Sequence, residues 1–114
     1  MADLSETTTT TVFNLQRRLL KMINEATKYA LIIFEQFGET EETMPELDEL
    51  QNVRERSASY YIRLYRLLLQ VAESQPTATS ATLELLTQSI DQTQAIADAG
   101  EASIQEIRRN WNLS

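Results

Sequence analysis

The stretch LELLTQSIDQTQAIADAGEASIQEIRRNW, residues 83–111, carries the most regular hydrophobic pattern in this chain of 114 residues. Apolar or small residues recur there at alternating spacings of three and four, which is the spacing of one packed helix face. The stripe consists of Leu83, Leu86, Ile90, Thr93, Ala97, Gly100, Ile104, Ile107 and Trp111. The pattern predicts a helix over residues 80–110. Because Thr93, Ala97 and Gly100 are small, we expect a neighbouring backbone to approach closely at that level.

Two further segments show the same periodicity. Residues 12–37 form a predicted helix that ends at Gly38, which can adopt the left-handed conformation of a helix terminus. Residues 44–74 form another, and Thr43 and Glu46 have the spacing of a capping box at its start. Pro76 then breaks the helix. The inner stripe of the first helix is Val12, Leu15, Leu19, Met22, Ala26, Tyr29, Ile33 and Phe37. That of the second is Leu47, Leu50, Ser57, Tyr61, Leu64, Leu68 and Val71, with Val53 or the stem of Arg54 filling the gap after Leu50.

The composition agrees with long helices. Two glycines and two prolines are few for a β-rich chain, which needs frequent turn residues. We therefore predict an all-α fold, an up-down-up antiparallel three-helix bundle over residues 12–114. Residues 1–11, with five consecutive threonines, are predicted to form a flexible tail whose Thr10 or Thr11 caps the first helix.

The second helix has more apolar surface than a three-helix bundle buries. A second stripe lies about 120° around from the inner one, at 100° per residue. On the first helix Phe13, Leu20 and Leu31 flank the inner stripe, and Ile32 points nearly opposite. A contiguous apolar stripe is typical of an interaction surface. We therefore predict a homo-oligomer, with a dimer favoured, that completes a larger helical core through an interface of Leu31, Ile32, Ala58, Ile62, Tyr65, Leu69 and Ala72.

Several chemistries have no support in the sequence. The chain has neither histidine nor cysteine, which excludes imidazole ligation, thiolate chemistry and disulfides. It also lacks the motifs G-x-S-x-G and the P-loop. Seven acidic residues in 35–50 lack the order of a calcium loop and are typical of a solvated corner. We predict no catalytic residue, no cofactor and no metal, and hence no enzyme.

Nucleic acid and membranes are both disfavoured as partners. The net charge of −7 opposes attraction to polyanions. The longest apolar run, Tyr29 to Phe34, is far shorter than the roughly 20 residues that span a bilayer. The first residues do not have the pattern of a signal peptide, and we expect a cytoplasmic protein.

The stretch YYIRLYRLLLQVA, residues 60–72, interleaves tyrosine with arginine, as nucleic-acid surfaces do. On a helical wheel, however, Tyr61 faces inward and Tyr65 lies on the second apolar stripe, which leaves only Tyr60 to stack on a base. The sequence therefore predicts a non-enzymatic protein–protein interaction module, such as an adaptor, assembly factor or regulator. The alternative is a nucleic-acid-associated accessory protein that uses Arg54, Arg56, Arg63 and Arg66. A third class, a small-molecule-binding bundle, would need a pocket lined by Tyr60, Tyr61 or Arg63.

Overall fold

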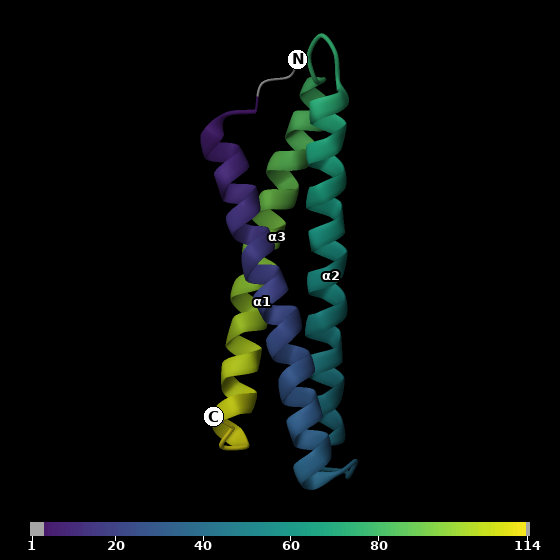
Figure 1. Ribbon diagram of the computed structural model, residues 1–114, viewed down its shortest axis with the longest axis vertical. Helices are drawn as coiled ribbons and strands as arrows, with labels where there is room; N and C mark the ends of the chain where they lie inside the picture. The colour runs from purple at the N-terminus through teal and green to yellow at the C-terminus, as the bar shows by residue number, and fades with distance from the viewer. Residues whose placement is uncertain (1–3, 114) are drawn as a thin grey trace.

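The computed structural model describes residues 4–113, which form three α-helices packed against one another and no β-strand. The helices are α1 (Glu6–Phe37), α2 (Met44–Glu73) and α3 (Ser80–Asn110). Together they form a rod with extents of 56 × 19 × 17 Å. The loop between α1 and α2 lies at one end of the rod, and the turn between α2 and α3 lies at the other (Figure 1). The all-α prediction is confirmed, and the predicted breaks lie where the helices end.

α1 begins earlier than the sequence pattern predicts. Ser5 caps it by accepting a hydrogen bond from the backbone N–H of Thr8 at 3.0 Å, and residues 7–11 are helical. The predicted flexible tail is therefore wrong for residues 6–11, whereas residues 1–3 lie outside the described part of the chain. One reason is tertiary, because Leu4 packs against the core, and the other is local, because the Ser5 side chain caps the first turn.

The predicted capping box at the start of α2 does not form. Thr43 has a helical backbone conformation and makes no side-chain cap. Its buried hydroxyl instead donates to the carbonyl of Gly38 at 2.8 Å and accepts from the N–H of Thr40 at 2.8 Å. Glu46 accepts a hydrogen bond from the indole of Trp111 at 2.8 Å. Both side chains thus fix the loop and the C-terminal end of α3 rather than the first turn of α2.

The core consists of two apolar clusters separated by a polar layer. The corner cluster, near the α1–α2 loop, includes Tyr29, Ile33 and Leu50, and the turn cluster, near the α2–α3 turn, includes Val12, Leu64 and Val71. Between them lie buried polar residues, Gln16 on α1, Ser57 on α2, and Ser89 and Thr93 on α3, and we call Gln16, Ser57 and Thr93 the polar waist. The predicted inner stripes supply most of the two clusters, so the helical periodicity located the core correctly.

Ser57 is fully buried, and its hydroxyl has no hydrogen-bond partner among residues 4–113. A buried polar group without a partner costs about 1–3 kcal/mol. We therefore expect Ser57→Ala to raise the free energy of unfolding by about 1 kcal/mol, measured by urea denaturation. The exposed Ser59 of the same helix provides the control, because Ser59→Ala changes helix propensity alone. A Ser57→Ala variant that is less stable than Ser59→Ala would contradict this account.

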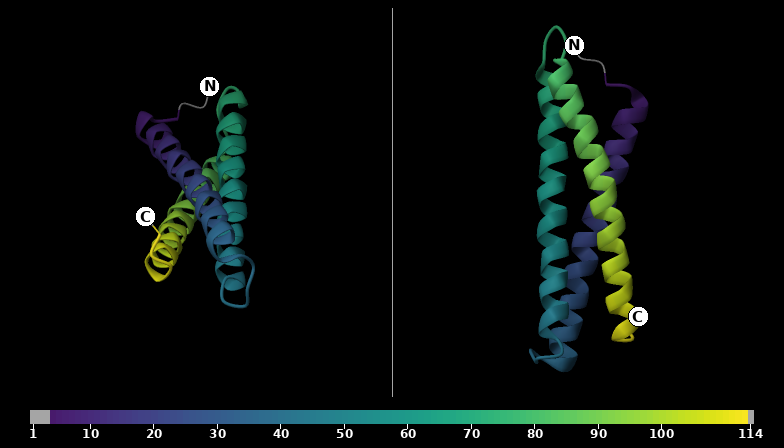
Figure 2. Two further views of the ribbon diagram at one scale, coloured as in Figure 1. Left: turned by 60° about the horizontal axis from the view of Figure 1, so that its bottom comes forward. Right: turned by 180° about the vertical axis from the view of Figure 1, so that it is seen from behind.

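α1 and α3 cross one another, while α2 packs against both (Figure 2). The nearest atoms to a β-carbon built on Gly100 belong to the side chains of Met22 on α1 and Val53 on α2. The expected close approach at Gly100 is therefore made by the methionine side chain and not by a neighbouring backbone. Leu83, which the pattern placed in the core, is 41% exposed, because the buried side of the first turns of α3 passes through Thr82 and Leu86 instead.

One ion-pair cluster joins α1 to α3 near this crossing. The Arg18 guanidinium donates two hydrogen bonds to Glu101, at 2.7 and 3.1 Å, and one to Asp98 at 2.7 Å. The hydrogen bond with Glu101, followed by that with Asp98, raises the pKa of Arg18 further above its usual value. Because a bidentate pair with a second carboxylate has well-defined geometry, it stabilises more than an isolated surface pair.

We expect Arg18→Gln to lower the free energy of unfolding by about 1 kcal/mol at low salt. The loss should shrink as salt is added, because screening weakens the wild-type interaction. Arg17→Gln is the matched control, since Arg17 is exposed and makes no ion pair within residues 4–113. Urea denaturation at two ionic strengths measures both effects. Equal losses for the two variants would show that the cluster contributes nothing specific.

Candidate interaction surface

The second stripe of α2 is largely exposed, as its position on the helix predicts. Ile62, Tyr65 and Leu69 are 46%, 53% and 44% exposed. Ala72 is exposed and Ala58 is half-buried. These side chains lie one and two helical turns apart on a single side of α2, so they form one continuous apolar strip.

This strip points away from α3. The guanidinium of Arg63 on α2 donates to the amide oxygen of Gln92 on α3 at 3.2 Å, which identifies the side of α2 that faces α3. Tyr65 follows Arg63 by two residues and therefore lies about 200° around the helix. Leu69 lies one turn beyond Tyr65. The strip consequently borders α1, and α3 does not cover it.

α1 extends this apolar surface. Arg18 faces α3 through Glu101, and Leu20 lies about 200° around the helix from Arg18. Leu20 is 52% exposed, and Phe13, two turns earlier on the same side, is 53% exposed. The turn cluster joins Val12 and Leu15, which flank Phe13, to Leu64, Leu67 and Val71 on the part of α2 that carries the strip, whereas Leu20 lies next to Leu19 of the corner cluster. We define the outer face as the exposed apolar side chains of Phe13, Leu20, Ile62, Tyr65 and Leu69.

Two residues of the predicted interface lie elsewhere. Leu31 is 58% exposed, but it lines a groove with Gln51 and Arg54 near the other end of the molecule. Leu69 follows Arg54 by fifteen residues, which corresponds to about 22 Å along the helix. Leu31 therefore does not adjoin the outer face, and its distance from Leu69 follows from the chain reversal at residues 38–43.

Ile32 is half-buried and packs against the corner cluster, together with Trp111 and Leu113. Trp111 also packs edge-on against Phe37, with ring centroids 5.0 Å apart. The prediction that Ile32 borders Ile62, Tyr65 and Leu69 is therefore wrong. The C-terminal end of α3 bends onto α1 there, and periodicity within α1 carries no information about that contact.

The sequence showed Phe13 and Leu20 as flanking residues but did not place them in the interface. Their spacing of seven residues puts them on one side of a helix, because seven residues make nearly two turns. That spacing was the available signal. What it lacked was the register of α1 against α2, which decides that these two residues, and not Leu31, lie beside Tyr65 and Leu69.

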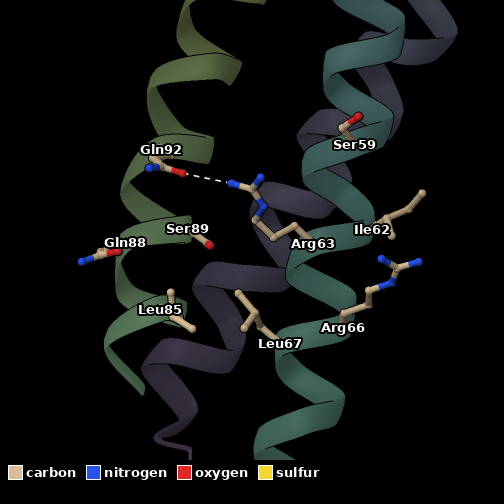
Figure 3. Close-up of a pocket in the computed structure, with 9 residues that line it drawn as sticks. All are labelled: Ser59, Ile62, Arg63, Arg66, Leu67, Leu85, Gln88, Ser89 and Gln92. Atoms are coloured by element: carbon tan, nitrogen blue, oxygen red, sulfur yellow. Dashed lines mark hydrogen bonds between the residues drawn. The ribbon is translucent and has the colours of Figure 1, made fainter. Parts of the chain in front are cut away.

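A second surface feature is an open groove of about 670 Å³ between α2 and α3. Leu67 and Leu85 point toward one another across it, and Arg63 reaches from α2 toward Gln92 (Figure 3). Ile62 and Arg66 also line the groove, but their side chains extend from the side of α2 that faces away from α3 (Figure 3). Its lining residues are Ser59, Ile62, Arg63, Arg66, Leu67, Leu85, Gln88, Ser89 and Gln92.

The tyrosines of residues 60–72 are poorly placed to stack on bases. Tyr60 and Tyr61 are half-buried against the corner cluster. The guanidinium of Arg63 lies 5.0 Å from the ring centroid of Tyr60, so it covers the one tyrosine that the sequence left free. Tyr65 is exposed and belongs to the outer face. Arg54 is half-buried and pairs with Glu55 at 3.6 Å.

No family model matches the chain, and no curated protein and no solved structure matches it. Within residues 4–113, no group of three acidic side chains is arranged to hold a metal ion. None of the helices in that range has an apolar stretch of the length and hydropathy needed to cross a bilayer. The outer face and the α2–α3 groove are the two surface features that suggest a function.

Proposed function

We propose that this chain is a small non-enzymatic protein–protein interaction module, of the adaptor, assembly-factor or regulator type, that self-associates through α1 and α2. The supporting observation is the outer face, whose five large apolar side chains on α1 and α2 are each about half exposed. Contiguous apolar surface of this kind is typical of a contact site, whereas isolated exposed apolar residues are ordinary.

A two-fold homodimer is the proposed assembly. In this assembly each subunit is an up-down-up antiparallel bundle, whose helices α1 and α2 together present the outer face. Pairing two such faces about a two-fold axis covers both at once, because each subunit offers the same patch. Each half-exposed side chain would contribute about 1 kcal/mol on burial, before the costs of association. Ala58 and Ala72 at the edges would let the facing helices approach closely.

The oligomeric state tests this proposal directly. Sedimentation velocity or light scattering should show a dimer at tens of micromolar protein and a shift toward monomer on dilution. A strictly monomeric wild-type protein at tens of micromolar would refute self-association. The outer face would then have to be assigned to a contact with a different protein.

The alternative function, nucleic-acid binding through the arginines of α2, has weaker support. It would require exposed aromatic rings beside the cations, but Tyr60 is covered by Arg63 and Arg54 is paired with Glu55. A gel-shift series with single-stranded DNA at rising salt separates the two functions. Phosphate binding must weaken steeply as salt rises, whereas burial of the outer face must not.

A further inference from the structure

We propose that the groove between α2 and α3 is a docking site for an acidic amphipathic helix of a partner protein. This goes beyond self-association, because it concerns a different surface with a different occupant. Ile62 borders both surfaces, but the remaining lining residues of the groove do not belong to the outer face. The two proposals can therefore fail separately.

The size of the groove suits a short helix. Its lining extends from Ser59 to Leu67 on α2 and from Leu85 to Gln92 on α3, which corresponds to about 10–12 Å along each helix axis, or two helical turns. The groove is open along its length, so an occupant lies between α2 and α3 as a fourth helix of the bundle. Leu67 and Leu85 offer it an apolar floor on which one or two apolar side chains would be buried (Figure 3).

Charge specifies the occupant. The protein has a net charge of −7, yet the lining of the groove contains two arginines and no acidic residue. The structure gives neither Arg63 nor Arg66 an ion pair within residues 4–113. Arg63 reaches across the groove and Arg66 borders it from the outer side of α2, so the site is partly apolar and cationic on a negatively charged protein, and complementarity favours an occupant that carries carboxylates (Figure 3).

Arg63 is already held in place for this contact. Its guanidinium stacks over Tyr60 at 5.0 Å from the ring centroid and donates to Gln92 at 3.2 Å. A side chain fixed in this way loses little rotamer freedom when a carboxylate binds. The exposed amides of Gln88 and Gln92 add neutral hydrogen-bonding groups on the α3 side. Apolar floor and cationic rim together match a helix that has leucine on one side and glutamate on its flanks.

The probe is a synthetic helical peptide with leucines at helical spacing and glutamates on both flanks, and the matched peptide has lysine in place of every glutamate. Amide NMR titration of the full chain should show shift changes concentrated at Leu67, Leu85 and Gln88 with the glutamate peptide. The lysine peptide should bind at least about tenfold more weakly. Equal binding of the two peptides, no binding of the glutamate peptide, or changes centred on the outer face would overturn the proposal.

Paired variants isolate the groove. The double substitution Arg63→Glu with Arg66→Glu should weaken binding at least about tenfold, whereas Arg56→Glu, an exposed arginine of α2 outside the groove, should change it less than about twofold. Leu85→Glu should also weaken binding, and the matched Leu83→Glu should not, because Leu83 does not line the groove. Circular dichroism shows whether each variant remains helical. Equal losses within either pair would overturn the proposal.

Two outcomes would assign the groove to a different occupant and also overturn the proposal. One is displacement of the glutamate peptide by single-stranded DNA that binds more tightly than the peptide does. The other is conversion of a wild-type dimer to monomer by the Arg63→Glu and Arg66→Glu substitutions, which would make a second copy of the chain the occupant. Peptide binding that persists in Leu69→Glu shows that the groove acts independently of the outer face.

Discussion

Leu69→Glu should convert the dimer to a monomer while the helices remain folded. Leu69 is the last large apolar residue of the α2 strip and 44% of its surface is exposed, so the fold of one subunit does not depend on burying it. In a two-fold dimer both copies of the new carboxylate would be buried without a partner. Burial of an unpaired charge is costly, and we expect the dissociation constant to rise at least about a hundredfold. Sedimentation velocity measures this change, and circular dichroism checks the fold.

Leu83→Glu is the matched control for this experiment. Leu83 is similarly exposed, at 41%, but it is on α3 and away from the outer face. The control adds the same charge, so general repulsion between subunits that now carry more negative charge affects both variants alike. A dimer that survives Leu69→Glu, or one that Leu83→Glu dissociates equally well, would show that the outer face is not the contact.

Gly100→Val should destabilise the fold by about 2–3 kcal/mol. A β-carbon at Gly100 would meet the terminal methyl group of Met22, which must shift, and the two further methyl groups of valine would crowd Met22 and Val53 at this buried position. Helix propensity alone would favour valine over glycine slightly, so a loss of stability must come from overpacking. Urea denaturation gives the change in the free energy of unfolding.

A double-mutant cycle with Met22→Ala identifies the cause. Met22→Ala leaves space beside Gly100, so the double variant should be at least about 1 kcal/mol more stable than the sum of the two single effects predicts. Ala102→Val, at an exposed position of α3, reports the cost of a β-branched residue without the collision. If the effects of Met22→Ala and Gly100→Val on the free energy of unfolding simply add, crowding against Met22 is not the cause of the destabilisation.

Most of the fold could be predicted from periodicity, and the reason is visible in individual residues. Leu19, Ile33, Leu64 and Ile104 lie on their stripes at spacings of three and four, and all four are buried. Local signals were less reliable. Thr43 and Glu46 have the sequence of a capping box but bond to Gly38, Thr40 and Trp111 instead, because the loop and the end of α3 compete for the same side chains.

The candidate site could be predicted only in part. The exposed strip Ile62, Tyr65 and Leu69 follows from the wheel of one helix, because it depends on that helix alone. Assigning neighbours to it requires the register between helices, and for that reason Leu31 and Ile32 were wrongly placed beside it. The α2–α3 groove could not be predicted from the sequence, because Arg63 and Leu85 line one groove only once α2 and α3 are packed together.

The polar waist divides the molecule into two parts that need not open together. Hydrogen bonds along each helix are continuous, but the apolar contacts that protect them belong either to the corner cluster or to the turn cluster. Cooperative opening units tend to follow such contiguous cores. Amide hydrogen exchange should therefore fall into two classes with a boundary near Gln16, Ser57 and Thr93. In that case Phe13, Tyr65 and Leu69, the part of the outer face on the turn-cluster side of the waist, could loosen or tighten with the binding state while the half held by Trp111 and Glu46 stays closed.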